Sequence, residues 1–254
     1  MSLFEAVFLG IIQGLTEFLP ISSSGHLVIF QHLLGVNDGG LIFEVVVHFG
    51  TLLAVLAVYW KDIAALVTKP FQKYNLLLIA ATVPTAIIGL SLDELFETMF
   101  TSVKVVGISL LITGVLLAVA ELLARRQEGA DIKKFGHAVL IGTGQALAIT
   151  PGISRSGTTI ALGMMLGLNR ETAARFSFIL SIPAILGATL LKTKDLFLYP
   201  LPTVEIIPYL VGAVCAALSG FLAIKLLLSI LRKGRLFYFS IYCWLLGLIV
   251  LFVL

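Results

Sequence analysis

Long apolar segments separated by short polar ones run along the whole chain. A helix needs about 20 apolar residues to cross the roughly 30 Å of hydrocarbon in a bilayer. A membrane barrel would instead show alternating segments of about ten residues. The pattern therefore predicts an all-α integral membrane protein. The segments expected to span the membrane are residues 41–60, 75–92, 103–124, 176–191, 206–230 and 237–254.

Two polar runs interrupt the apolar pattern, and neither lies in a loop that connects two of these spans. Residues 13–26 read QGLTEFLPISSSGH, and residues 145–159 read QALAITPGISRSGTT. Residues 26–36, which follow the first run, are too short to cross a bilayer at about 1.5 Å per residue. Each run also contains a proline, which interrupts helical hydrogen bonds, and irregular backbone at membrane depth must be buried in protein or line a cavity. We therefore expect two re-entrant helix hairpins, at residues 3–36 and 136–168.

The two polar runs are related by an internal repeat. Six residues recur with the same identity at one offset of 132 positions, for example at positions 13 and 145. The pairs are Gln13 and Gln145, Ser22 and Ser154, Ser24 and Ser156, Gly25 and Gly157, Gly35 and Gly167, and Asn37 and Asn169. Such self-similarity indicates a duplication. We interpret the chain as one membrane domain, with repeat one at residues 1–124, a loop at 125–135 and repeat two at 136–254.

Each repeat would contain one hairpin and three spans, which is an odd number of crossings. The second repeat must then lie upside down relative to the first, and such inverted-topology repeats place a shared site near the membrane midplane. If the first hairpin enters from the outside, the outer loops keep only Lys104, Lys192 and Lys194 of the basic residues. This asymmetry obeys the positive-inside rule and puts both chain termini outside.

Composition narrows the classes of function. The chain is 59% hydrophobic and 12% charged, with a net charge of +3, whereas soluble domains carry about a quarter charged residues. The basic residues form no stripe with interleaved aromatics, so no nucleic-acid partner is expected. Cys215 and Cys243 lie in apolar segments, where cysteine acts as a small hydrophobic residue. The sequence offers no disulfide framework.

The first polar run carries groups that are costly to bury in lipid. Glu17 would lose roughly several kcal/mol of hydration unless it is paired, protonated or open to a water-filled cavity. Glu17 and His26 could act as acid, base or nucleophile, and Glu17 could hold a hard divalent cation. Gln13 lies one turn before Glu17 on the same helix face. Hydroxyls that could bind or attack phosphorus come from Ser22, Ser23 and Ser24.

The second polar run combines a cation with hydroxyls and a helix start. Arg155 can hold phosphate oxygens with two parallel hydrogen bonds, and a helix N-terminus adds free N–H groups. The other residues expected to bind an anion are Gly152, Ser154, Ser156, Gly157 and Thr159. Close helix packing in lipid could also explain small and hydroxyl residues, but it gives no reason for the arginine.

Three structural alternatives remain open at this stage. Glu17 and Arg155 could form a purely structural ion pair, and His26 could be a satisfied interior histidine. Glu44 and His48 lie four residues apart and so share one helix face. They could border the same cavity or only bond a neighbouring helix.

With these motifs the sequence resembles the undecaprenyl-diphosphatase family, the bacitracin-resistance proteins of bacterial inner membranes. The first family motif corresponds to Gln13–Glu17, followed by the serine and histidine segment FLPISSSGH. The second motif, PGxSRSxxT, is complete at Pro151–Thr159, and FEVVVHFGTLLAV follows the first tip. The resemblance extends over essentially the whole chain.

The resemblance implies hydrolysis of undecaprenyl diphosphate to undecaprenyl phosphate and inorganic phosphate, supported by Mg²⁺ or Ca²⁺. This reaction recycles the lipid carrier of peptidoglycan synthesis and confers bacitracin resistance, at a site that opens to the periplasmic face. The residues matching the family's essential positions are Glu17, Ser23, His26 and Arg155, and those matching its diphosphate-contacting positions are Ser22, Ser154, Ser156 and Thr159. Some members carry Glu where this chain has Gln13, which shifts metal binding and base chemistry to Glu17.

The sequence leaves the mechanism and the assembly state open. The nucleophile could be Ser23 assisted by His26, His26 itself, or an activated water. Inverted repeats with broken helices also build secondary transporters, so a carrier or flippase of a lipid phosphate or small anion is the alternative function. The expected partners are the substrate and membrane lipid. The one protein partner considered is a second copy of the chain, in a homodimer.

Overall fold

The computed structural model describes residues 1–36, 40–124, 132, 134–198 and 206–254. These residues form twelve helices and no strand, which confirms the all-α class. Their bounds are α1 Leu3–Phe18, α2 Ser23–Leu34, α3 Gly40–Val58, α4 Trp60–Thr68, α5 Lys73–Ser91, α6 Asp93–Phe100, α7 Val103–Ala124, α8 Phe135–Leu147, α9 Arg155–Met165, α10 Arg170–Leu198, α11 Ile206–Arg232 and α12 Phe237–Val253. Most of the predicted loop at 125–135 lies outside the described residues. Asn37, one of the residues matched in the predicted repeat, also lies outside them.

Several helices are long and apolar enough to cross a membrane, so the chain is a multi-pass membrane protein. The four that qualify alone are α5, α7, α10 over Arg170–Leu191, and α11. A fifth candidate is the bent pair of α3 and α4, whose axes meet at 81°. The α12 helix is apolar but shorter, and the sixth span therefore stays a prediction.

The structure differs from the predicted spans at two places. The span expected at 41–60 ends in the bend after Val58, because the sequence turns from apolar to amphipathic at Trp60, where α4 begins. Residues 93–100 form a separate short helix, α6, with Asp93 and Glu94 in its first turn. Acidic residues favour a helix N-terminus, and this helix lies between the spans predicted at 75–92 and 103–124.

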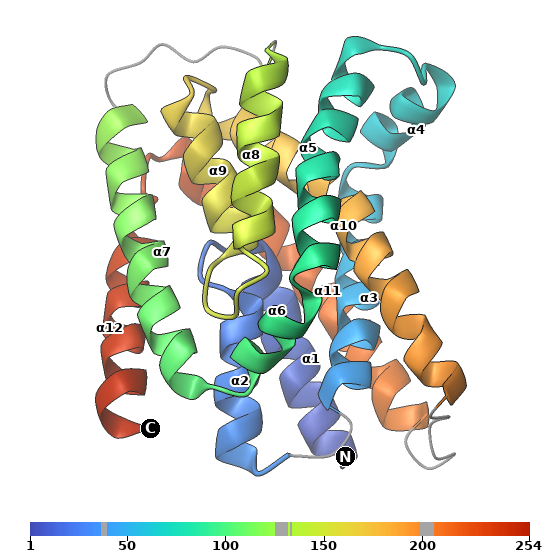
Figure 1. The fold of residues 1–254 in the computed structure, drawn as a ribbon, viewed down its shortest axis with the longest axis vertical. Helices are drawn as coiled ribbons and strands as arrows, with labels where there is room; N and C mark the ends of the chain where they lie inside the picture. The colour runs from blue at the N-terminus through green and yellow to red at the C-terminus, as the bar shows by residue number, and fades with distance from the viewer. Residues whose placement is uncertain (37–39, 125–131, 133, 199–205) are drawn as a thin grey trace.

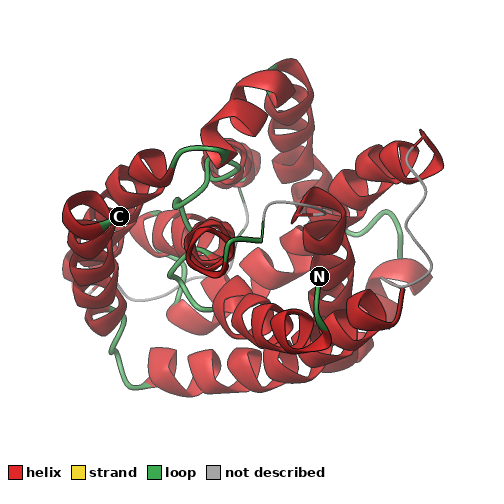
Figure 2. Ribbon diagram, turned by 90° about the horizontal axis from the view of Figure 1, so that it is seen from below, coloured by secondary structure: helices red, strands yellow, loops and turns green. Residues whose placement is uncertain are grey.

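Two helix pairs enter the molecule from its ends, and their connecting loops lie near its middle (Figure 1). The pair α1 and α2 approaches from the end that carries both chain termini, and the pair α8 and α9 approaches from the opposite end. Figure 2, seen from below, shows the helices packed side by side, with both chain termini on the near end. The loops of both pairs therefore lie deep in the molecule.

Local sequence explains the two breaks. The α1 helix ends at Phe18, and its C-cap Leu19 is extended (φ −68°, ψ 143°), as expected for a residue before proline. Ser22 and Ser154 then cap α2 and α9, accepting hydrogen bonds from the backbone N–H groups of the residues three positions on. Serine is a favoured N-cap because it satisfies one of the free donors of the first turn.

Small residues let the hairpin helices approach their neighbours closely. The α1 helix packs against α11, where a Cβ on Gly10 would lie 2.4 Å from the carbonyl oxygen of Gly212. The α8 helix packs against α5, where a Cβ on Gly142 would lie 1.9 Å from the carbonyl oxygen of Ala81. Such contacts are typical of helix association in lipid, which depends on close packing rather than on the hydrophobic effect.

Candidate active site

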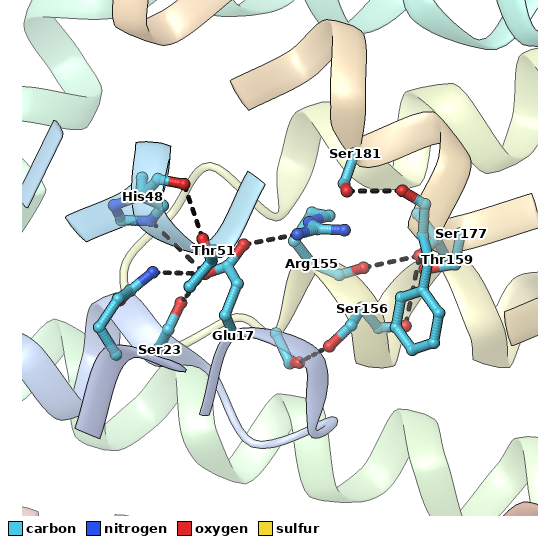
Figure 3. A network of polar contacts seen from close by, with 12 residues as sticks. Glu17, Ser23, His48, Thr51, Arg155, Ser156, Thr159, Ser177 and Ser181 are labelled. Atoms are coloured by element: carbon cyan, nitrogen blue, oxygen red, sulfur yellow. Dashed lines mark hydrogen bonds and ion pairs between the residues drawn. The ribbon is translucent and has the colours of Figure 1, made fainter. Parts of the chain in front are cut away.

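The ends of the two hairpins meet through an ion pair. Glu17 lies in the last turn of α1, and Arg155 is the first residue of α9. The Arg155 Nη2 atom donates to Glu17 Oε1 over 2.5 Å, and the Glu17 side chain is only 5% exposed. A second contact joins the tips, because Ser156 Oγ donates to the Leu19 carbonyl oxygen over 3.1 Å. The structure thus brings together the two residues that the sequence placed in one site (Figure 3).

Glu17 is the centre of this site. Its Oε2 atom accepts hydrogen bonds from Ser23 Oγ at 2.5 Å and from Gln13 Nε2 at 2.9 Å. The Ser23 contact has the short length of a hydroxyl bound to a charged carboxylate. A buried carboxylate is stable only when paired and hydrogen-bonded, and these contacts meet that condition. The Ser23 hydroxyl therefore donates its hydrogen bond to a group that can act as its base.

His48 of α3 also faces Glu17. Its Nε2 atom lies 3.5 Å from Glu17 Oε2. Its Nδ1 atom lies 2.7 Å from the Glu44 carbonyl oxygen, and a carbonyl can only accept, so Nδ1 carries a proton. The Nε2 atom is therefore the one available for proton exchange at the carboxylate. The sequence allowed His48 either a place at the cavity or a bond to a neighbouring helix, and in the structure it lines the cavity.

The His26 ring bonds Ser22 and Tyr242 rather than Glu17, which agrees with the alternative of a satisfied interior histidine. Its Nδ1 atom is 2.7 Å from the Ser22 carbonyl oxygen, and its Nε2 atom is 2.7 Å from the Tyr242 hydroxyl on α12. The ring is buried and does not line the cavity that contains Glu17. Both ring nitrogens are engaged, so His26 is not poised as acid, base or nucleophile in this arrangement. Its assignment as an essential residue remains a prediction from the family resemblance.

A cavity of about 250 Å³ opens beside the Glu17 and Arg155 pair. Its apolar wall includes Phe100, Ile149 and Ile185. The polar and charged residues that line it are Glu17, Ser22, Ser23, Ser24, Glu44, His48, Ser154, Arg155 and Thr189. The cavity combines carboxylates, hydroxyls, a guanidinium and the N-terminus of α9. Such a donor set suits a phosphate group.

Arg155 has capacity left for an anion. Its Nη1 atom is buried and has no hydrogen-bond partner among the described residues. A guanidinium carries five N–H donors in a fixed fork, which matches phosphate oxygens. Buried donors without partners are rare in folded proteins. We take this donor as the clearest sign that the cavity accepts a negatively charged group.

Other residues expected to bind the substrate hold the second tip in shape, and their part in binding stays a prediction. Gly152 has φ +91°, and a Cβ there would lie 2.5 Å from the Val106 carbonyl oxygen. Thr159 Oγ1 bonds Ser177 Oγ at 2.6 Å (Figure 3). Neither residue lines the cavity, and the same holds for Gln13, Ser156 and Gly157. Gln13 acts on the site through its hydrogen bond to Glu17.

Sequence reasoning missed a support for the second tip. Thr113 of α7 donates to the Gly152 carbonyl oxygen and accepts from the Ser154 backbone N–H, each over 3.1 Å. One hydroxyl therefore satisfies two backbone groups at the break before α9. Thr113 is a polar residue inside an apolar span, and that feature was the available signal.

The site contains no preformed metal cage. Among the described residues, no group of three His, Cys, Asp or Glu side chains could hold a metal ion. Both oxygens of Glu17 already accept hydrogen bonds. Mg²⁺ is often held by one or two carboxylates together with substrate phosphates and water. The carboxylates of Glu17 and Glu44, which both line the cavity, fit that second kind of site.

Comparison with known proteins agrees with the motifs. The model of the family described as bacitracin resistance protein BacA matches residues 6–249. An undecaprenyl-diphosphatase of Halothermothrix orenii is 45% identical over 253 residues, covering 99% of this chain and 98% of that protein. An undecaprenyl-diphosphatase of Carboxydothermus hydrogenoformans is 46% identical over 253 residues, covering 99% and 97%. The chain therefore belongs to the bacitracin resistance protein BacA family.

Proposed function

We propose that this protein hydrolyses undecaprenyl diphosphate to undecaprenyl phosphate and inorganic phosphate, and so confers bacitracin resistance. The relatives named above carry this activity in their names. The observation that carries the proposal is the 2.5 Å hydrogen bond from Ser23 to a buried carboxylate that an arginine holds in place. That arrangement supplies a nucleophile, a base and an anion-binding cation in one cavity.

The diphosphate binds between the two tips. Arg155, the N-terminus of α9 and the hydroxyls of Ser22, Ser24 and Ser154 surround the space that its oxygens occupy. These groups offset the cost of bringing several negative charges to membrane depth. The same groups stabilise the charge of a phosphoryl-transfer transition state, because positioning and electrostatics supply most of the catalysis in such reactions.

Ser23 is the proposed nucleophile, and Glu17 is its general base. Glu17 Oε2 takes the hydroxyl proton, and Ser23 Oγ forms a bond to the terminal phosphorus. The bond from that phosphorus to the bridging oxygen breaks, and undecaprenyl phosphate leaves. Water then hydrolyses the phosphoserine to inorganic phosphate, with His48 and Glu17 moving the protons. The geometry favours Ser23 over His26, whose ring nitrogens are both engaged.

A divalent cation would complete the charge balance. Glu17 and Glu44 are the residues that would hold it, together with the diphosphate oxygens. When bound, Mg²⁺ or Ca²⁺ neutralises phosphate charge and polarises the phosphorus–oxygen bonds. Because the protein supplies few ligands, we expect the cation to bind with the substrate.

The membrane topology that we propose is an inverted repeat of six spans and two hairpins in the bacterial inner membrane. The helices that pack against each other support this topology. The first hairpin helix of repeat one, α1, packs on α11, and its counterpart α8 packs on α5, which corresponds to α11. The remaining spans pair across the repeats as α3 with α10 and α7 with α12. The loop charges put the cavity on the periplasmic side, while the homodimer stays a prediction.

Phosphate release by the purified protein in detergent tests the function. The substrate is a C15 or C55 prenyl diphosphate, assayed first with Mg²⁺ and then with EDTA. We expect stoichiometric release of prenyl monophosphate and inorganic phosphate that stops when the cation is removed. If the protein released no phosphate but moved a lipid phosphate across proteoliposome membranes, the carrier would replace the phosphatase.

A further inference from the structure

The short helix α4 lies at the end of the bundle that is opposite the chain termini (Figure 1). Its axis makes an angle of 81° with that of α3, which belongs to a candidate span, and α5, which follows it, is another candidate span. A helix that joins two spans at such an angle lies along the membrane surface rather than through the membrane. The proposed topology puts this surface on the inner side.

One face of α4 exposes large apolar side chains. Trp60 and Val67 lie seven residues apart on that face and are 61% and 74% exposed, and Phe71, just after the helix, is 89% exposed. The opposite face packs against the core through Ile63 and Leu66. A short helix with one buried face and one exposed apolar face, at a membrane surface, is typical of an interfacial helix. Its exposed face therefore meets lipid.

A cavity of about 440 Å³ lies between α4 and the first turns of α5 and α10. The charged residues that line it are Asp62, Lys73 and Arg175, which leave one net positive charge. Arg175 Nη2 bonds the Asp62 carboxylate. Lys73 makes no ion pair with any described residue. The lysine charge is therefore available to an anion.

The same cavity contains hydrogen-bond donors that the protein does not use. Gln72, the N-cap of α5, makes no side-chain cap bond, so the free N–H groups of this helix start remain open to another acceptor. The Tyr74 hydroxyl is buried at the cavity without a hydrogen-bond partner among the described residues. The hydroxyl of Tyr59 is in the same state, in a residue only 7% exposed that interacts electrostatically with Arg175 and Tyr74. Buried hydroxyls without partners are rare, and these indicate an anionic ligand.

We propose that this cavity binds the phosphate of an anionic phospholipid from the inner leaflet, and that the lipid's acyl chains lie against the exposed face of α4. Lys73, the start of α5 and the Tyr74 hydroxyl hold the phosphate. A lipid rather than a free anion follows from the position of the cavity beside side chains that need hydrocarbon. The cytoplasmic leaflet is also the one whose anionic lipids attract basic residues. This site shares no lining residue with the cavity at Glu17, so the inference does not depend on the proposed phosphatase function.

Tryptophan fluorescence tests the site, because the chain has two tryptophans and one of them is Trp60. The Trp244→Phe protein, which keeps only Trp60, is reconstituted in phosphatidylcholine vesicles. Part of the lipid is replaced by phosphatidylglycerol or phosphatidylcholine with brominated acyl chains, since bromine quenches a nearby tryptophan. We expect both to quench Trp60, with a relative binding constant at least about fivefold higher for phosphatidylglycerol. Absence of quenching, or equal quenching by the two lipids, would overturn the proposal.

Two variants in the same background locate the head group. Lys73→Gln removes the unpaired charge, and Tyr74→Phe removes only a hydroxyl that has no partner in the protein. We expect each to lower the preference for phosphatidylglycerol at least about threefold. The matched control is Lys233→Gln, because Lys233 is an exposed lysine between α11 and α12, outside the cavity. An equal loss in Lys233→Gln would mean diffuse attraction to the membrane surface and would contradict a built site.

Two further measurements separate the remaining outcomes. Excess inorganic phosphate should leave the preference for phosphatidylglycerol unchanged, whereas its loss would assign the cavity to the free anion. Melting temperatures in neutral detergent check that the variants fold. If Lys73→Gln folded poorly, Tyr74→Phe would decide the question, because removing an unpartnered hydroxyl does not break a contact within the protein.

Discussion

At the scale of single residues, one carboxylate organises the chemistry. Glu17 contacts a hydroxyl, an amide, a guanidinium and an imidazole that come from three separate parts of the chain. Each contact restricts its orientation. The Ser23 hydroxyl donates its proton to Glu17 over 2.5 Å, and its oxygen can attack phosphorus.

The Ser23→Ala variant should lose at least about 99% of turnover, because loss of a nucleophile costs more than loss of one positioning hydrogen bond. Initial rates of phosphate release measure this, with Ser24→Ala as the control that changes a neighbouring cavity hydroxyl. Rapid quenching of the wild-type enzyme should trap phosphate on Ser23. Retention of more than about a hundredth of the wild-type rate would favour attack by water instead.

The His48→Ala variant should lower kcat about tenfold or more while KM changes little, because His48 acts on Glu17 rather than on the bound head group. The conservative variant His48→Gln keeps a hydrogen-bonding side chain and should recover part of the rate. A wild-type kcat in His48→Ala would show that this histidine is structural.

At the scale of elements, the two tips depend on a few residues that permit irregular backbone. Gly152 has a positive φ and lies against Val106 and Ser109 of α7, and Thr113 of the same helix bonds the adjoining backbone. The α7 helix therefore shapes the tip from which Arg155 begins α9. A change at Gly152 acts on the site without touching the reacting atoms.

The Gly152→Ala variant should lower thermal stability in detergent and reduce activity. A side chain at this φ costs of order 1–3 kcal/mol, and the Cβ would also clash with the α7 backbone. Gly136→Ala serves as the control, since a Cβ there meets open space and alanine favours a helix by up to about 1 kcal/mol. Equal melting temperatures for the two variants would contradict the assigned role of Gly152.

At the scale of the whole molecule, the Glu17 and Arg155 pair joins hairpins from opposite ends of the bundle. The two residues are 138 positions apart, and they meet at 2.5 Å in a largely buried setting. Removing one partner of a buried pair leaves an uncompensated charge, whereas removing both charges is often neutral. Substitutions in this pair should therefore affect both the stability of the protein and its catalysis.

The Arg155→Met variant should lose about 3–5 kcal/mol of stability together with all measurable activity. Combining it with Glu17→Gln should restore much of the stability but none of the activity. Thermal unfolding in detergent and phosphate release provide the two measurements. If the double variant unfolded as readily as the single one, the pair would not be the contact that holds the tips together.

Much of the fold and part of the site could be predicted because they follow from local sequence. Long apolar runs require membrane helices, Pro20 and Pro151 interrupt them, and the serines beside them cap the next helices. A carboxylate and an arginine in apolar surroundings must find partners. These requirements depend on residue type and spacing, and they were sufficient to predict that Glu17 and Arg155 share a site.

Only the tertiary structure decided which side chains share the cavity. His26 lies three residues from Ser23, yet its ring bonds Tyr242 on α12, while His48 from α3 faces the carboxylate instead. The cavity between α4, α5 and α10 likewise depends on how α10 approaches two helices that are far from it in the chain. A rotamer or an interhelical distance is set by packing between segments far apart in the chain, and local pattern does not encode it.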